Sequence, residues 1–125
     1  MTTKPRKILI MEDEHPLATA LELKLTSEGF EVDIAYDGES GMKKLLEKSY
    51  DLILLDLIMP LKDGFKVLEE MKEANIKVPV IALTNLSQRE DLDRVKDYGV
   101  DKYLVKSDTP LHEVVDNIKK FLGDK

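Results

Sequence analysis

Apolar residues in this chain form short runs that alternate with longer segments of mixed character. One run, at residues 31–35, alternates polar and apolar side chains and is expected at the edge of a sheet. Runs at 8–11, 52–55 and 80–83 are apolar at every position, as in strands covered on both faces. The complete set of predicted strands is 7–11, 31–35, 51–55, 78–83 and 101–105.

The segments between these runs carry apolar residues at helical spacing, which predicts five amphipathic helices. Gly29 and Gly99 fit the left-handed position that ends a helix, and Thr109-Pro110 fits an N-cap followed by proline at the first helical position. Strands alternating with helices favour a parallel sheet covered on both faces. The helical stripes are Leu17, Leu21, Leu25; Met42, Leu45, Leu46; Phe65, Leu68, Met71; Leu92, Val95; and Leu111, Val114, Val115, Ile118, Leu122.

Length and composition limit the kind of protein. A chain of 125 residues with 42% hydrophobic residues is expected to form one domain over 1–125, with its core at about 7–122. The absence of cysteine excludes disulfides and zinc-thiolate sites. The basic N-terminus is followed by too few apolar residues for a signal or a membrane span, so we expect a cytoplasmic protein. A net charge of -6 argues against direct nucleic acid binding.

Polar residues follow four of the predicted strands directly. Glu12 and Asp13 follow the first strand, Asp56 the third, Thr84 the fourth and Lys106 the fifth. Ligands of open α/β sheets bind at this carboxyl edge. Carboxylates that converge there repel one another unless a cation neutralises them, and oxygen ligands without sulfur favour Mg²⁺. We therefore expect an acidic Mg²⁺ site that would accept a phosphate-bearing ligand.

The motifs around these residues resemble the receiver domains of bacterial two-component response regulators. Each motif alone is weak, but their joint order on the expected strands is specific, and the resemblance runs from Lys7 to about Phe121. It implies a doubly wound, five-stranded parallel sheet of the flavodoxin-like (βα)5 type, with strand order 2-1-3-4-5. The motifs are Ile10-Met11-Glu12-Asp13-Glu14, Asp56-Leu57-Ile58-Met59-Pro60, Asp63-Gly64, Thr84, and Tyr103-Leu104-Val105-Lys106.

The resemblance implies a role for each acidic residue. Asp56 would be the phospho-acceptor, forming an aspartyl phosphate. Asp13, Asp56 and the backbone carbonyl of Ile58 would hold Mg²⁺, with Glu12 acting mainly through water.

The resemblance also implies how phosphorylation would be read out. Lys106 would place a point charge on the phosphoryl group, and the Thr84 hydroxyl would donate to one of its oxygens. Tyr103, three residues before the lysine, would turn inward into the space that Thr84 vacates. Because Thr84 and Tyr103 flank the fourth helix, fifth strand and fifth helix, and the fourth helix has the thinnest apolar stripe, we predict that these three elements form the output surface.

A receiver domain is expected to work with protein partners. The phosphoryl donor would be a sensor histidine kinase or a histidine phosphotransfer protein, and the domain would catalyse only its own phosphorylation and dephosphorylation. The target would be a separate output protein or an output domain outside this sequence. We expect a monomer or a weak, phosphorylation-dependent dimer.

Simpler interpretations exist for each residue alone. Glu12-Asp13 could cap a helix, Asp56 could lie in a polar turn, Lys106 could be a surface charge and Thr84 a strand end. Two other functions also remain. A receiver-like module could bind partners without phosphorylation. An aspartyl-phosphate phosphatase or phosphotransferase would carry a second carboxylate two residues after the nucleophile, where this chain has Ile58.

The sequence departs from the family pattern at two positions beside the site. Asn85 follows Thr84 where a small residue is more usual, and Ser107 replaces a common proline after Lys106. A cis bond before a non-proline residue costs about 2.5 to 4 kcal/mol, so we predict a trans Lys106-Ser107 peptide. The apolar residues Ile58 and Leu86 offer no hydrogen bond to an attacking water, which predicts a long-lived phosphorylated form.

Overall fold

The computed structural model describes residues 4–85 and 89–123, with backbone only for 89–92. Its five strands form one parallel sheet in the order β2-β1-β3-β4-β5, as predicted. The edge position of β2 and the central positions of β1, β3 and β4 are likewise confirmed. The strands are β1 (Lys7–Met11), β2 (Glu31–Ala35), β3 (Leu52–Leu55), β4 (Val80–Thr84) and β5 (Lys102–Val105).

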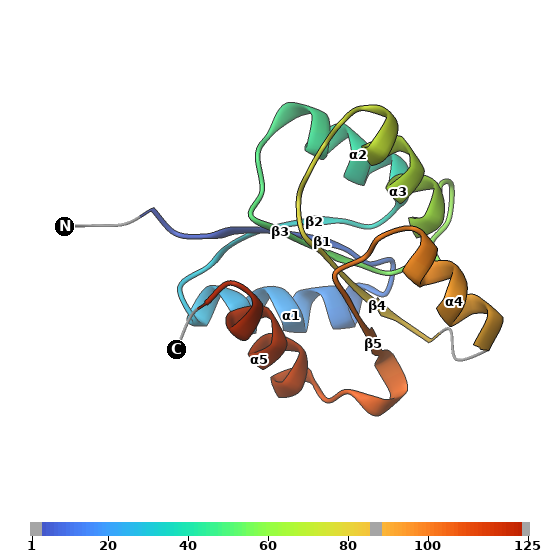
Figure 1. The fold of residues 1–125 in the computed structure, drawn as a ribbon. Coiled ribbons are helices and arrows are strands. Elements are labelled where there is room, and N and C mark those ends of the chain that lie inside the picture. The colour runs from blue at the N-terminus through green and yellow to red at the C-terminus, as the bar shows by residue number, and fades with distance from the viewer. Residues whose placement is uncertain (1–3, 86–88, 124–125) are drawn as a thin grey trace.

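Helices cover both faces of the sheet. Figure 1 shows α1 and α5 on one side of the strands and α2 and α3 on the other, with α4 beside β4 and β5. No helix among the described residues is long and apolar enough to cross a membrane. The helices are α1 (His15–Ser27), α2 (Gly38–Glu47), α3 (Gly64–Glu73), α4 (Arg89–Asp97) and α5 (Leu111–Phe121).

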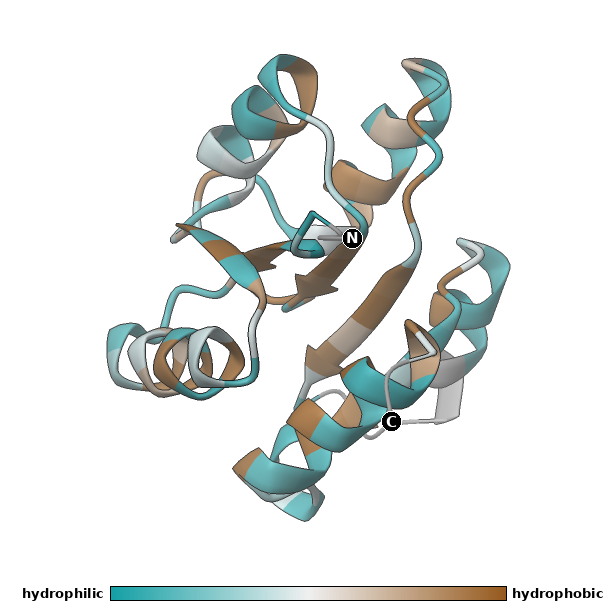
Figure 2. Ribbon diagram, turned by 90° about the vertical axis from the view of Figure 1, so that its left-hand side faces the viewer, coloured by the Kyte–Doolittle hydropathy of each residue, from teal (hydrophilic) through white to brown (hydrophobic). Residues whose placement is uncertain are grey.

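The pleat of the central strands divides the core into two layers. Leu9 and Ile53 point towards the layer that contains α2 and α3 residues, whereas Ile8 and Leu52 point towards the layer of α1 and α5. All four side chains are fully buried. Figure 2 shows the resulting hydrophobic strands between helices whose outer faces are hydrophilic.

Several element ends differ from the prediction. β3 begins at Leu52 and β5 at Lys102, because the preceding aspartates use their side chains to bind neighbouring strands: Asp51 accepts from Lys7 N–H at 2.7 Å and Asp101 from Val80 N–H at 2.9 Å. β4 begins and ends later than predicted, at Val80 and Thr84.

Two other details of the helices were predicted wrongly. Thr109 does not cap the last helix: α5 has Pro110 at its N-cap, after a short 3-10 turn at Lys106–Asp108. Leu46 is 67% exposed and lies outside the buried stripe of α2. The left-handed conformations predicted for Gly29 and Gly99 are confirmed, with φ of 97° and 77°.

Candidate functional site

Three acidic side chains meet at the carboxyl edge of the sheet. Glu12 and Asp13 follow β1, Asp56 follows β3, and one carboxylate oxygen of each lies within 4.8 Å of the others. These strands are hydrogen-bonded neighbours, so their ends meet as predicted. A pocket of about 220 Å³ opens here, lined by Asp13, Glu14, Asp56, Ile58, Asn85 and Lys106.

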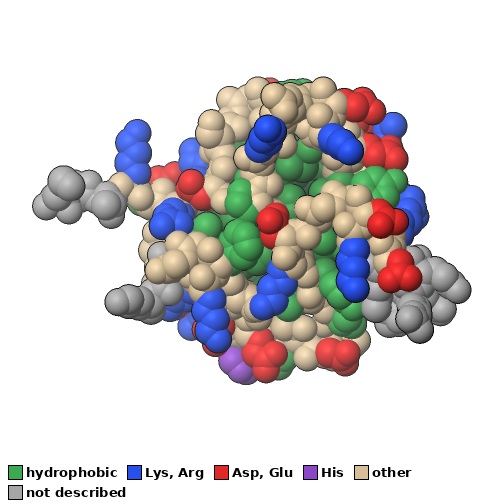
Figure 3. Space-filling model, in the orientation of Figure 1, with side chains coloured by type: hydrophobic (Ala, Val, Ile, Leu, Met, Phe, Trp, Pro, Cys, Tyr) green, Lys and Arg blue, Asp and Glu red, His purple; other side chains and the backbone are tan. Residues whose placement is uncertain are grey.

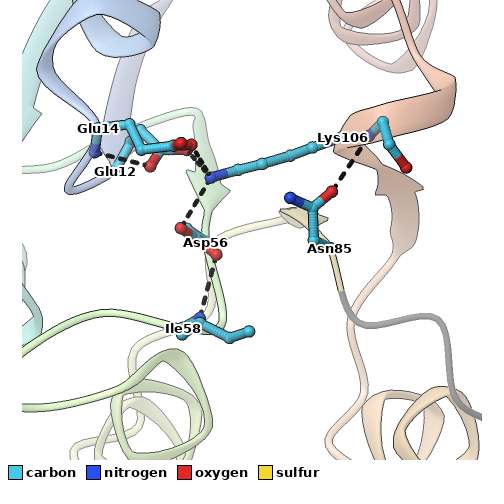
Figure 4. A network of polar contacts seen from close by, with 7 residues as sticks. Glu12, Glu14, Asp56, Ile58, Asn85 and Lys106 are labelled. Carbon is cyan, nitrogen blue, oxygen red and sulfur yellow. Dashed lines mark hydrogen bonds and ion pairs between the residues drawn. The ribbon is translucent and has the colours of Figure 1, made fainter.

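The ammonium group of Lys106 lies among the carboxylates. Its Nζ is 2.9 Å from Asp56 Oδ2, 2.7 Å from Glu12 Oε1 and 2.6 Å from Glu14 Oε2 (Figure 4). The contact with Glu12 Oε1 is an ion pair without hydrogen-bond alignment. Lys106 thus neutralises part of the negative charge, and its side chain is only 11% exposed.

Burial shifts the titration of this cluster. Glu12 is 2% exposed, and burial raises its pKa to about 7, with a smaller contribution from the negative charge of Asp56. Burial also raises the pKa of Asp56, although the N–H of Ile58 and the ammonium of Lys106 oppose this shift. Burial alone would lower the pKa of Lys106, but its carboxylate partners raise it above the usual value. The pocket therefore concentrates negative charge that a cation stabilises.

Backbone groups fix the orientation of the two buried carboxylates. Ile58 N–H donates to Asp56 Oδ1 at 3.0 Å, and Glu14 N–H donates to Glu12 Oε2 at 3.0 Å. Because Lys106 holds Oδ2 of Asp56 and Ile58 holds Oδ1, the carboxylate of Asp56 is anchored through both oxygens.

The Asp63-Gly64 motif has a structural role beside the site. Asp63 caps α3 by accepting from Lys66 N–H at 2.9 Å. Gly64 packs against the backbone of Asp56 and Leu57: a Cβ at this position would lie 2.7 Å from the carbonyl oxygen of Asp56. A side chain at Gly64 would therefore displace Asp56.

The two predicted switch residues lie on neighbouring strands. Thr84 is fully buried at the end of β4. Its partner on β5 is Val105, the residue that precedes Lys106. Tyr103 is half-buried on β5 and packs against the core layer that includes Val95 of α4. Thr84 is thus close to the pocket, and Tyr103 belongs to the core layer that also contains α2 and α3 residues.

The simpler interpretations of the four charged residues Glu12, Asp13, Asp56 and Lys106 do not hold. The N-cap of α1 is Glu14, which makes no side-chain capping bond, so Glu12 and Asp13 are not its cap. Asp56 is 4% exposed and therefore not part of a solvated turn. Lys106, with its three carboxylate partners, is not a free surface charge.

Sequence reasoning missed two contacts around the pocket. Glu14 pairs with Lys106, which its place beside Glu12 and Asp13 could have suggested. Ser107 N–H donates to Asn85 Oδ1 at 3.1 Å, a contact between distant segments that no local pattern reveals. The predicted trans Lys106-Ser107 peptide is confirmed, since the described residues contain no cis bond.

A further missed contact is an aromatic stack between two residues that do not line the pocket. His15 stacks on Tyr36 with ring centroids 3.8 Å apart. The His15 side chain is exposed. Leu86, predicted beside the site, lies outside the described residues.

The donor set fits Mg²⁺. Carboxylate oxygens and main-chain carbonyls are the ligands of hard cations, and the three clustered carboxylates belong to Glu12, Asp13 and Asp56. Two of these side chains are buried, so the site concentrates negative charge in a partly enclosed space.

Curated relatives of this chain are longer response regulators. The response regulator ArlR of Staphylococcus saprophyticus is 45% identical over 100 residues, which are 80% of this chain and 45% of that protein. The transcriptional regulatory protein DltR of Streptococcus agalactiae is 39% identical over the same shares. The chain therefore spans about half the length of the curated relatives it matches.

Solved receiver structures share the fold. A CheY-like receiver domain from Methanospirillum hungatei has a TM-score of 0.87 at 25% identity, covering 95% of this chain and 94% of that chain. TrrA from Thermotoga maritima, solved in complex with Mg²⁺ and BeF, has a TM-score of 0.78 at 31% identity, covering 92% and 97%. The family model of the response regulator receiver domain matches residues 8–118. With its sheet order and acidic edge, this chain belongs to the response regulator receiver domain family.

Proposed function

We propose that the chain accepts a phosphoryl group on Asp56 in a Mg²⁺-dependent reaction and uses it to switch a protein-binding surface. The observation that carries the proposal is the pairing of buried Asp56 with the Lys106 ammonium, 2.9 Å away, inside an acidic cluster. An ion pair between one buried carboxylate and a lysine does not explain why two further carboxylates lie beside it. A cation site combined with a nucleophile explains the cluster.

The transfer forms one bond and breaks another. A carboxylate oxygen of Asp56 attacks phosphorus, and the bond between phosphorus and the donor nitrogen of a phosphohistidine breaks. Asp13, Asp56 and the carbonyl of Ile58 would hold Mg²⁺, with Glu12 acting through water. The ion, when bound, neutralises the charge that the transferred group brings. Lys106 would then exchange a carboxylate partner for a phosphoryl oxygen.

Thr84 would link the site to the proposed switch. Thr84 is buried one residue before Asn85 and would donate its hydroxyl to a phosphoryl oxygen, drawing the end of β4 inward. Tyr103 would follow into the vacated space. The affected surface would be α4, β5 and α5, because Tyr103 packs against the layer that contains Val95 of α4.

The rival functions lack support at this site. A phosphatase of the aspartyl type would need a second carboxylate at residue 58, where a 55% exposed isoleucine lines the pocket instead. A receiver-like module that binds partners without phosphorylation would not require a pocket with buried charged side chains. Autophosphorylation and autodephosphorylation are the remaining catalytic acts, and we propose both for this chain.

The partners follow from the longer relatives. We propose a histidine kinase or phosphotransfer protein as donor, and a separate or covalently attached output module as target. A cytoplasmic location and a monomer or weak phosphorylation-dependent dimer belong to the same proposal.

Intact-mass spectrometry after incubation with acetyl phosphate or phosphoramidate tests the proposal. We expect one added phosphoryl group in the presence of Mg²⁺, none after chelation, and none in Asp56→Asn. Asp63→Asn is the matched control, because Asp63 lies on the same loop but caps α3, and asparagine also caps well. Equal labelling of Asp56→Asn and wild type would overturn the assignment of Asp56.

Amide hydrogen exchange tests the switch separately. Saturation with beryllofluoride and Mg²⁺ should change exchange in α4, β5 and α5. Changes restricted to α1 and α2 would contradict the proposed output surface but not the proposed phosphorylation of Asp56.

A further inference from the structure

One hydrogen bond joins the two segments that border the pocket beside Lys106. Asn85 directly follows β4, and its Oδ1 accepts from the backbone N–H of Ser107 at 3.1 Å (Figure 4). Ser107 lies in the 3-10 turn that begins at Lys106. A proline at residue 107 would have no N–H to donate. The contact therefore depends on both of the residues at which this chain departs from the family pattern.

This bond determines which end of the Asn85 amide faces the pocket. The backbone N–H of Ser107 can only donate, so its partner is the side-chain oxygen of Asn85. The side-chain nitrogen of Asn85 then points away from Ser107. Figure 4 shows that nitrogen on the side of Asp56. Asn85 also lines the same pocket as Asp56 and Lys106. The amide nitrogen can therefore donate towards a group bound at Asp56.

We propose that Asn85 contacts the phosphoryl group on Asp56, donating a hydrogen bond from its side-chain nitrogen, and that Ser107 N–H is the positioning group for this donor. The inference rests on the proposed phosphorylation of Asp56. Of the side chains that line the pocket, Lys106 and Asn85 are the two that carry N–H donors. A phosphoryl group spreads its charge over three oxygens, more than the single ammonium of Lys106 can contact at once.

A steric role for Asn85 makes the opposite prediction. If Asn85 only narrowed the pocket, a shorter side chain would let phosphoryl mimics bind as well or better. If it only fastened the loop, its loss would lower thermal stability without changing the affinity of the site. The donor role instead predicts weaker binding of the phosphoryl mimic in a folded domain.

Beryllofluoride affinity in the presence of Mg²⁺, measured by NMR titration, separates these roles. Asn85→Ala should weaken binding about tenfold, the usual loss for one hydrogen bond to a charged group. Asn85→Asp keeps an acceptor for Ser107 but places negative charge towards the mimic, so it should bind more weakly still. Thermal melting of each variant checks that the domain is folded. Unchanged or tighter binding by Asn85→Ala would overturn the proposal.

A double-mutant cycle tests the positioning by Ser107. Ser107→Ala keeps the backbone N–H and should bind beryllofluoride like the wild type, whereas Ser107→Pro removes the N–H. The loss caused by Asn85→Ala should stay about tenfold beside Ser107→Ala and fall below about threefold beside Ser107→Pro. An equal loss in both backgrounds would show that Ser107 does not position the amide.

The controls separate this inference from the function on which it rests. Asp56→Asn should abolish beryllofluoride binding. Failure of the wild type to bind beryllofluoride would overturn both proposals. Normal binding by the wild type, lost in Asp56→Asn but unchanged in Asn85→Ala, would overturn the role of Asn85 alone.

Discussion

Lys106 is the residue on which the electrostatics of the pocket depend. It contacts Glu12, Glu14 and Asp56 within 2.9 Å, and Glu12 and Asp56 are almost completely buried. Removing one partner of a buried ion pair leaves charge without compensation, which costs more than the pair itself contributes. The lysine that would contact the phosphoryl group is therefore also a structural residue of the unphosphorylated domain.

Lys106→Met should lower the free energy of unfolding at pH 8 by about 3 kcal/mol, because the carboxylates lose their cation. Mg²⁺ should restore part of this loss, so the rise in Tm on adding Mg²⁺ should be larger in the variant than in the wild type. Lys62→Met is the control. Lys62 forms an ion pair with Glu70, with 2.7 Å between Nζ and Oε1, and neither residue lines the pocket. Equal responses to Mg²⁺ in wild type and Lys106→Met would contradict the expectation that Lys106 and Mg²⁺ neutralise the same carboxylates.

Ile58 controls the lifetime of the phosphorylated form in this proposal. Its side chain is 55% exposed at the rim of the pocket and cannot orient an attacking water. We expect Ile58→Glu to speed loss of the phosphoryl group, measured by the decay of the phosphorylated mass after removal of the donor. Leu61→Asn is a suitable control, because Leu61 is 79% exposed but does not line the pocket. Identical decay in Ile58→Glu and wild type would remove residue 58 from the explanation.

Besides its ladder with β1, the edge strand β2 contacts the segment after α2 through the polar side chain of Asp33. Asp33 accepts a 2.7 Å hydrogen bond from the Tyr50 hydroxyl and pairs with Lys48 at 3.4 Å. Burial on its own would raise the pKa of Asp33, but Tyr50 and Lys48 outweigh it and lower the pKa below its usual value. The folded state thus favours the ionised carboxylate.

Asp33→Asn should lower the free energy of unfolding by about 1 kcal/mol at pH 7. Because the pKa of Asp33 is lower in the folded state, its ionised form contributes stability above the unfolded pKa and loses it as pH falls through the folded pKa. The difference between variant and wild type should therefore shrink at acidic pH, as measured by urea unfolding. Glu31→Gln, which affects only an exposed pair with Lys7, should change stability little at either pH. A difference that stays constant with pH would exclude the proposed ionic contribution of Asp33.

Periodicity predicted the elements well but not their ends. The uniformly apolar runs of β1, β3 and β4 require two covered faces, and the alternation in β2 requires an edge, so strand positions could be inferred locally. The ends of β3 and β5 depend on Asp51 and Asp101, whose side chains bind residues 44 and 21 positions away. Such partners exist only after folding, so the sequence could not set those limits.

The candidate site shows the same division. The convergence of Asp13, Asp56 and Lys106 was predictable, because each lies one or two residues after a strand and the strand ends meet at one edge. The contact between Ser107 and Asn85 joins segments 22 residues apart through one backbone donor, and no pattern of side chains indicates it.

At the scale of the molecule, charge limits what the domain can bind. The net charge is -6, and the visible face in Figure 3 has Lys and Arg side chains dispersed among acidic ones instead of gathered in a basic patch. A phosphate backbone needs clustered cations for binding at physiological salt. We therefore predict that the face shown in Figure 3 does not bind DNA directly.

Locating the phosphoryl group on the chain tests the phospho-acceptor proposal most directly. After labelling with acetyl phosphate and Mg²⁺, borohydride reduction converts an aspartyl phosphate to homoserine, which peptide mass spectrometry can place at a single residue. We predict homoserine at position 56 only, and none when Mg²⁺ is chelated before labelling. Homoserine at another aspartate, or equal conversion at position 56 without Mg²⁺, would contradict the proposed function of the pocket.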